Sequence, residues 1–86
     1  ALEGGIVFNP GNVLDGTGVT SGDIPIPMAF VGDIVEVSPG ESPKSCLVQG
    51  YVRATGLVRI RLQNETGSMQ PFVATTWRVR VKSFQS

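Results

Sequence analysis

The chain has 86 residues, a formal net charge of zero, no histidine and a single cysteine, Cys46. These features predict one small domain and exclude an internal disulfide and the His/Cys clusters that bind zinc. No apolar run approaches the roughly 18 residues of a membrane span, so we expect no membrane contact. Because the chain has no histidine and no cysteine pair, we expect no metal, and we expect no cofactor. A domain this small often gains buried area from other chains, so we expect oligomerisation or docking on a larger partner.

The N-terminal 23 residues contain short apolar groups separated by turn-forming residues. Ile6-Val7-Phe8 follows a glycine pair and predicts either a terminal edge strand or an arm laid on a neighbouring chain. Residues 9–23 are rich in Asn, Gly, Asp, Ser and Thr, and their apolar anchors are Val13, Leu14 and Val19. A loop of this length in so small a domain is usually functional or ordered by a partner. We therefore expect an N-terminal arm over residues 1–23 and a folded domain over residues 24–86.

Short strands separated by turns are expected from residue 24 onward. Their predicted ranges are 24–29, 30–37, 46–53, 57–63 and 75–82, and Phe72-Val73 either opens a further short strand or braces the loop. Prolines alternate with Ile24, Ile26 and Met28, which predicts an edge strand with these three side chains facing inward, because proline lacks the N–H that a central strand donates. Residues 54–56 suit a three-residue hairpin turn with a glycine at positive φ.

The strands at 57–63 and 75–82 alternate most clearly between apolar residues and arginines. One face carries Val58, Ile60, Leu62, Trp77, Val79 and Val81, and the other carries Arg59, Arg61, Arg78 and Arg80. A period of two with β-branched residues is typical of half-buried strands. The pattern as a whole predicts an all-β fold, namely a small antiparallel β-sandwich or barrel of about six to eight strands with jelly-roll or Greek-key connections.

The charges are divided between the two halves of the chain. Residues 1–43 carry six acidic side chains and no basic one, whereas residues 44–86 carry seven basic side chains and Glu65. In one interpretation, Arg59, Arg61, Arg78 and Arg80 pair with carboxylates of a partner protein. In the other, both signs pair across strands on a solvated sheet face of the same chain. A net charge of zero argues against nucleic acid as the partner.

We identify no catalytic residue and expect the chain not to be an enzyme. Asp33 and Glu36 lie three residues apart on a predicted strand, so their carboxylates point to opposite faces. Cys46 has no histidine to activate it. The Asn64-Glu65-Thr66 sequence matches the glycosylation acceptor pattern, but we interpret it as a turn.

Three motifs in fixed order resemble a small β-sandwich domain of tailed bacteriophages. They are GDIVEVSP at 32–39, RLQNETG at 61–67 and WRVRV at 77–81, and the resemblance covers about residues 24–82. In those phages the domain occurs in structural proteins of the virion, such as head decoration (cement) proteins and the C-termini of fibres.

The resemblance implies a structural protein on the outer capsid surface, made in the cytoplasm of the host bacterium. It would bridge neighbouring major capsid subunits, and a homotrimer is the expected assembly. The expected contact residues are Ile6, Val7, Phe8, Val13, Leu14, Val19, Arg59, Arg61, Arg78 and Arg80. The alternative is a receptor- or glycan-binding tip domain of a phage fibre, which requires an exposed aromatic ring at Trp77 or Tyr51.

Overall fold

A computed structural model describes residues 2–83, and within this range the chain is all-β, with nine strands and no helix. The strands are β1 (Leu2–Phe8), β2 (Asn12–Val13), β3 (Gly18–Thr20), β4 (Ile24–Pro25), β5 (Ile34–Ser38), β6 (Leu47–Ala54), β7 (Leu57–Gln63), β8 (Gln70–Pro71) and β9 (Thr75–Lys82). Every pairing is antiparallel, which confirms the predicted fold class. The described residues contain no helix that could cross a membrane.

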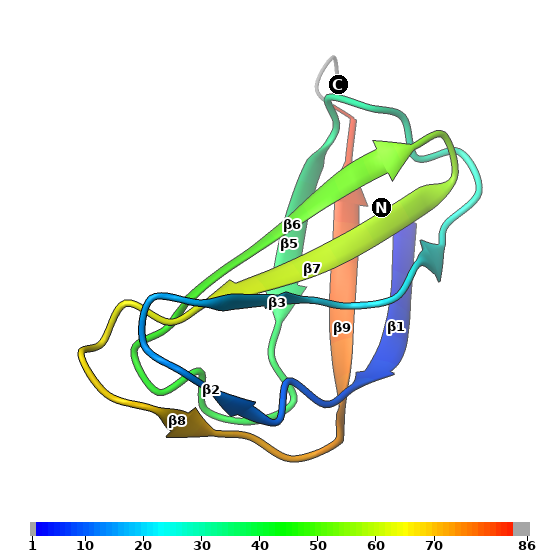
Figure 1. The fold of residues 1–86 in the computed structure, drawn as a ribbon. Helices are drawn as coiled ribbons and strands as arrows, with labels where there is room; N and C mark the ends of the chain where they lie inside the picture. Colours follow the sequence, from blue (N-terminus) through cyan, green and yellow to red (C-terminus); the bar gives the residue numbers. More distant parts are fainter. Residues whose placement is uncertain (1, 84–86) are drawn as a thin grey trace.

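The strands form two main sheets and a short ribbon (Figure 1). In the first sheet, β9 lies between β1 and β5. In the second, β7 pairs with β6 along one edge and with both β3 and β4 along the other. β2 and β8 form the ribbon. Figure 1 shows β6 and β7 crossing in front of β5, β9 and β1, and the sheet edges meet where β1 lies beside β4 and β5 beside β6.

The core lies between the two sheets and is built from the alternating apolar faces of β7 and β9. The buried side chains of these strands are Val58, Ile60, Leu62, Trp77, Val79 and Val81. The ring of Phe8, at the end of β1, meets the Trp77 ring edge-on with 5.2 Å between centroids. The alternation in the sequence therefore identified the inward face of both strands correctly.

Two glycines allow the chain to follow this path. β6 approaches β5 so closely at Gly50 that a Cβ atom there would overlap the side chains of Val35 and Val37. Gly56 has a φ of 80° in the turn between β6 and β7, as predicted for the hairpin.

The predicted edge strand at 24–29 is shorter in the structure, because the chain turns after Pro25. Ile24 and Ile26 are buried as expected, but Met28 has a φ of 76° and its side chain is 68% exposed. The turn is closed by a hydrogen bond from the Ala29 amide to the Ile26 carbonyl, 3.1 Å. The expectation that Met28 faces inward is therefore wrong.

The next strand also begins later than predicted, at Ile34 instead of Phe30. A turn over Phe30–Asp33 precedes it, in which the Asp33 amide donates to the Phe30 carbonyl at 3.0 Å. The Asp33 carboxylate accepts a hydrogen bond from the Phe30 amide at 2.9 Å. The polar Gly32-Asp33 pair thus ends the turn and does not continue the strand.

Residues 2–23 fold into the same body as the rest of the described chain. β1 pairs with β9 over its whole length, from Leu2 opposite Val81 to Phe8 opposite Thr75. β2 pairs with β8, and β3 pairs with β7. The Ile6-Val7-Phe8 segment therefore belongs to an edge strand of this molecule and not to an arm laid on a neighbouring chain. The expected division between an arm at 1–23 and a domain at 24–86 does not appear as a structural boundary within residues 2–83; residues 1 and 84–86 lie outside the described residues.

Candidate partner-binding surfaces

The four arginines predicted to contact a partner lie on two different sheets. Arg59 and Arg61 are on the outer face of β7, and Arg78 and Arg80 are on the outer face of β9. Because the sheets pack face to face through the alternate residues of these strands, the two pairs point to opposite sides of the molecule. The structure does not bring the four side chains together into one binding surface.

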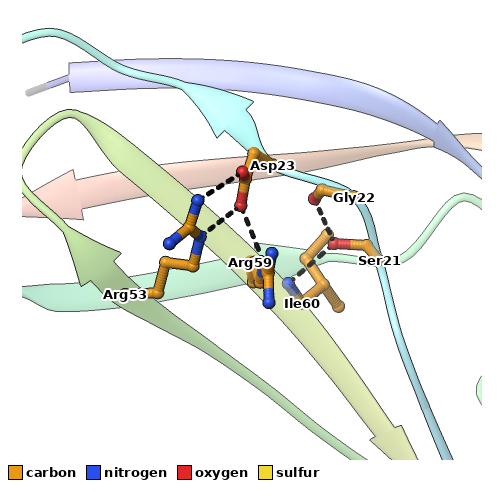
Figure 2. A network of polar contacts seen from close by, with 6 residues as sticks. All are labelled: Ser21, Gly22, Asp23, Arg53, Arg59 and Ile60. Atoms are coloured by element: carbon orange, nitrogen blue, oxygen red, sulfur yellow. Dashed lines mark hydrogen bonds and ion pairs between the residues drawn. The ribbon is translucent and has the colours of Figure 1, made fainter.

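Arg59 shares a carboxylate with Arg53 in the network shown in Figure 2. Asp23 Oδ1 accepts from Arg53 Nε and from Arg59 Nε, both at 2.7 Å, and Oδ2 accepts from Arg53 Nη2 at 2.8 Å. The hydrogen bonds from Arg53 and then Arg59 hold the pKa of Asp23 well below its usual range. The same contact raises the pKa of Arg53.

The segment that carries Asp23 joins β3 and β4 to the same edge of β7. The Ser21 amide donates to the Ile60 carbonyl at 2.8 Å, and the Ser21 hydroxyl accepts from the Ile60 amide at 2.9 Å (Figure 2). That hydroxyl in turn donates to the Gly22 carbonyl at 2.9 Å. Between β3 and β4, Ser21 therefore supplies the hydrogen bonds to β7 that a continuous strand would make. The Asp23 network fixes the same segment to β6 and β7 on the outer face of the sheet. We assign a structural role to Arg59.

Most of the charge division in the sequence is neutralised within the chain. The remaining ion pairs are Arg80–Glu3 at 3.0 Å, Lys82–Glu36 at 3.1 Å and Lys44–Glu41 at 3.3 Å. These pairs, with the Asp23 network, match the interpretation in which both signs meet across strands of one molecule. Arg61 donates to Thr20 Oγ1 and Gln63 Oε1, both at 3.0 Å, whereas the side chain of Arg78 makes no hydrogen bond or ion pair within residues 2–83.

Two of the six predicted apolar contact residues are core residues, which corrects their expected place at a partner surface. Phe8 is 5% exposed because its ring packs on Trp77, and Val13 is 1% exposed because β2 turns it toward the core. Ile6 and Val19 are partly buried against the same core. Of the six, Val7 and Leu14 have largely exposed side chains.

A compact apolar surface that we did not predict lies in the turn between β4 and β5. Met28, Phe30 and Val31 are 68%, 51% and 68% exposed, and we call these three residues the apolar turn. Between them, Ala29 is fully buried, and its carbonyl accepts a 2.8 Å hydrogen bond from the Gly56 amide of the β6–β7 hairpin. The turn is thus fixed to the body of the molecule while its large side chains face outward.

The sequence contains a signal for this surface. The three large apolar residues stand between Pro27 and Gly32-Asp33, residue types that end strands and form turns. Assigning the flanking segments to strands placed Met28 on an inward face and included Phe30 and Val31 in a strand, so we missed their exposure.

The outer face of the β1–β9–β5 sheet contains a shallow hollow of about 750 Å³. Its lining includes Arg78 and Thr76 from β9, Gly5 from β1 and Ser38 from β5. We call it the Arg78 hollow. The ion pair between Glu3 and Arg80 borders it.

Reactive groups are not gathered at either surface. Cys46 is buried, and burial raises the pKa of its thiol, which disfavours the nucleophilic thiolate. Asp33 lies in a turn, whereas Glu36 pairs with Lys82 on the sheet. Within residues 2–83, no group of three or more His, Cys, Asp or Glu side chains could hold a metal ion.

No protein-family model matches the chain, and comparisons with curated proteins and with solved structures also give no match. A role for the chain must therefore come from the chemistry of its own surfaces. In the apolar turn three large side chains are exposed, and in the Arg78 hollow the Arg78 side chain has no ion-pair partner within residues 2–83.

Proposed function

We propose that this chain is a structural protein of a tailed bacteriophage, a decoration protein that docks on the capsid and stabilises it by bridging neighbouring major capsid subunits. The motifs at 32–39, 61–67 and 77–81 suggest this class of protein. The observation that carries the proposal is the apolar turn, where three large side chains are held outward by a hydrogen-bonded backbone. A homotrimer is the assembly we propose on the capsid.

The energetics of the apolar turn favour protein contact. Complete burial of a Val, Met or Phe side chain stabilises a complex by roughly 1.5–3 kcal/mol relative to its exposed state. The backbone of the turn is already fixed by hydrogen bonds at Ala29 and Asp33, so little conformational entropy is lost when a partner covers it. A rigid apolar group at one end of the molecule is therefore suited to fill a pocket on a large partner.

The chemistry of the described residues favours a structural role over an enzymatic one. The buried polar side chains, Ser21 and Asn64, complete hydrogen bonds of the fold. Asp23, whose pKa is lowered, is held by two arginines and is not part of the lining of the Arg78 hollow. These groups stabilise the sandwich and leave the exposed apolar side chains for contact with other chains.

The fibre-tip alternative has less support. Trp77 is fully buried, so it offers no ring face to a sugar. Tyr51 is half-buried on β6, and it is not among the described residues that line the Arg78 hollow. Neither ring therefore supplies the Arg78 hollow with the aromatic platform that glycan binding requires.

The test is binding to capsids assembled from the major capsid protein of the same phage, measured by co-sedimentation. Val31→Ser and Val73→Ser form a matched pair, because both valines are exposed, at 68% and 61%, and only Val31 is in the apolar turn. We expect the wild type and Val73→Ser to bind equally, Val31→Ser to bind more weakly, and a Phe30→Ser/Val31→Ser variant to bind at least about tenfold more weakly.

Two results would contradict the proposal. One is wild-type protein that stays in the supernatant at every capsid concentration, and the other is equal binding by Val73→Ser and by the variant of the apolar turn. The native mass of capsid-released protein tests the trimer, which requires three times the 9.1 kDa of one chain.

A further inference from the structure

The outer face of the β1–β9–β5 sheet is ordered in cross-strand rows, and two neighbouring rows differ in charge. In one row, Arg80 stands directly between Glu3 on β1 and Glu36 on β5. In the next row whose side chains face outward, Arg78 stands between Gly5 and Ser38. Arg80 therefore has a carboxylate on each side, whereas Arg78 has none.

The small neighbours of Arg78 create the hollow in which it lies. A Cβ atom built on Gly5 would stand 3.7 Å from Arg78 Cγ and 3.1 Å from the Trp77 carbonyl oxygen. A larger residue than glycine would therefore fill the space beside the arginine. The hydroxyls of Ser38 and Thr76 belong to the same lining and can donate to a bound acceptor.

The outer face of this sheet carries one more cationic side chain than it has carboxylates. Within residues 2–83 the face carries two carboxylates, Glu3 and Glu36, which pair with Arg80 at 3.0 Å and with Lys82 at 3.1 Å. Arg78 is the fifth charge, and its exposed side chain has no ion-pair partner among the described residues. The hollow thus contains one unmatched guanidinium with its donors free.

We infer that the Arg78 hollow binds a single carboxylate side chain of a partner protein. A guanidinium presents two parallel N–H donors that match a carboxylate, and a hollow that excludes part of the solvent strengthens such a pair. The nearby carboxylates of Glu3 and Glu36 disfavour a polyanion such as a nucleic acid backbone, which would meet repulsion on both sides. One singly charged acidic side chain neutralises the excess positive charge of this sheet face.

This inference deepens the proposed function, since it names the chemistry that a capsid partner would present. The apolar turn and the hollow lie on connected surface, because Ile34, 51% exposed, shares the outer face with Ser38. Ile34 and Ser38 are roughly 13 Å apart at the rise of an antiparallel strand. One partner surface could therefore cover the apolar turn and place an acidic side chain on Arg78.

The first test uses a peptide probe and needs no capsid. The probe is acetyl-Ser-Gly-Glu-Gly-Ser-amide, its control is the same peptide with Gln, and inorganic phosphate is a third arm. Arginine Nε–H signals of the ¹⁵N-labelled protein report binding. We expect the Glu peptide to shift the Arg78 signal at least about threefold more than the Gln peptide does, as charge pairing requires.

Arg61→Gln is the matched control for Arg78→Gln. Both arginines lack an ion-pair partner within residues 2–83, and Arg61 lies on the opposite sheet. The response of the two variants is read at the backbone amides of Gly5 and Ser38, the cross-strand neighbours of residue 78. We expect Arg78→Gln to abolish this response to the peptide and Arg61→Gln to retain it. Equal shifts at both arginines, equal effects of the Glu and Gln peptides, or a larger response to phosphate would overturn the inference.

The second test is co-sedimentation of the same two variants with capsids. We expect Arg78→Gln to bind at least about tenfold more weakly than Arg61→Gln, with a smaller dependence on salt. If wild type and Arg78→Gln bind capsids equally, the inference fails and the proposed function stands. If the Glu peptide binds at Arg78 but no capsid binds the wild type, the proposed function fails and the inference stands.

Discussion

The side-chain amide of Asn64 donates a 2.8 Å hydrogen bond to the backbone carbonyl of Val13, which lies 51 residues earlier in the chain. The same nitrogen donates to the Ser68 carbonyl at 2.8 Å, and its oxygen accepts from the amide and hydroxyl of Thr66. Asn64 is fully buried. The residue that matches a glycosylation acceptor therefore ties the end of β2 to the turn after β7.

Replacing Asn64 should destabilise the fold strongly. Asn64→Ala leaves the carbonyls of Val13 and Ser68 without this donor in a buried site, so we expect the free energy of unfolding to fall by about 2–4 kcal/mol. Urea denaturation measures the loss. Asn9→Ala is the matched control, because Asn9 is exposed and its side-chain oxygen accepts one hydrogen bond, from the Gly11 amide. Equal losses in the two variants would show that the buried network is not what stabilises this end of the molecule.

The Asp23 network predicts how stability changes with acid. The pKa of Asp23 is lower in the folded chain than its ordinary value, because Arg53 and Arg59 donate hydrogen bonds to the ionised carboxylate. Its contribution to stability is therefore present above the ordinary pKa of about 4 and is lost as the pH falls through the lower folded pKa. The Tm of wild type should exceed that of Asp23→Asn near neutral pH, and the difference should shrink as the pH falls below about 4.

Thermal unfolding of both proteins over this pH range tests the prediction. Glu65→Gln controls for the loss of one negative charge, since Glu65 accepts from the Gln63 amide and not from an arginine. A constant difference in Tm between wild type and Asp23→Asn at every pH would show that the arginine contacts do not depend on the ionised carboxylate.

Trp77 gives a direct optical test of the core. It is the single tryptophan of the chain, is fully buried, and its Nε1 donates to Thr75 Oγ1 at 3.1 Å. We expect blue-shifted fluorescence and little quenching by acrylamide until the protein unfolds. Trp77→Ala should cost about 3–5 kcal/mol, because the cavity would lie between the two sheets. Strong quenching in the native protein would place the ring at the surface and restore the glycan-binding alternative.

Deletion of residues 1–8 should unfold the chain and not simply remove a contact arm. β1 forms the edge of the first sheet and supplies Phe8 to the core, so its loss exposes β9 and one face of Trp77. We expect loss of the cooperative thermal transition, seen by circular dichroism. Val7→Ser, an outward-facing change in the same strand, should keep that transition. A truncated protein with the wild-type Tm would support the arm that we first expected.

The sequence predicted strands correctly where apolar and polar residues alternate, because the alternation alone shows which face of the sheet each residue lies on. β7 and β9 were predicted with the correct ends, because apolar residues and arginines alternate through their centres, over residues 58–62 and 77–81. β4 was predicted too long, since the inward pattern of Ile24 and Ile26 continues to Met28 in the sequence while a turn redirects the backbone. A period of two cannot reveal a change of direction that depends on hydrogen bonds from the distant hairpin at Gly56.

The sites depended on pairings that no local pattern contains. The charge division suggested arginine–carboxylate contacts, but whether the carboxylates belong to this chain depends on strands far apart in sequence. Arg59 and Asp23 are 36 residues apart, and Arg80 and Glu3 are 77 apart. Arg78 differs from Arg80 only through its cross-strand neighbours, Gly5 and Ser38, which become visible once the register is known.

The pairing of β1 with β9 also determines when the molecule can fold. β9 spans Thr75–Lys82, so the seven-residue β1 has no strand to pair with until nearly the whole described chain has been synthesised. Folding is therefore expected to be slow and all-or-none, because contacts of large sequence separation must form before the sheet gains stability. Until then the Ile6-Val7-Phe8 segment is exposed to other nascent chains, and Gly4-Gly5 within the same strand lowers its tendency to aggregate.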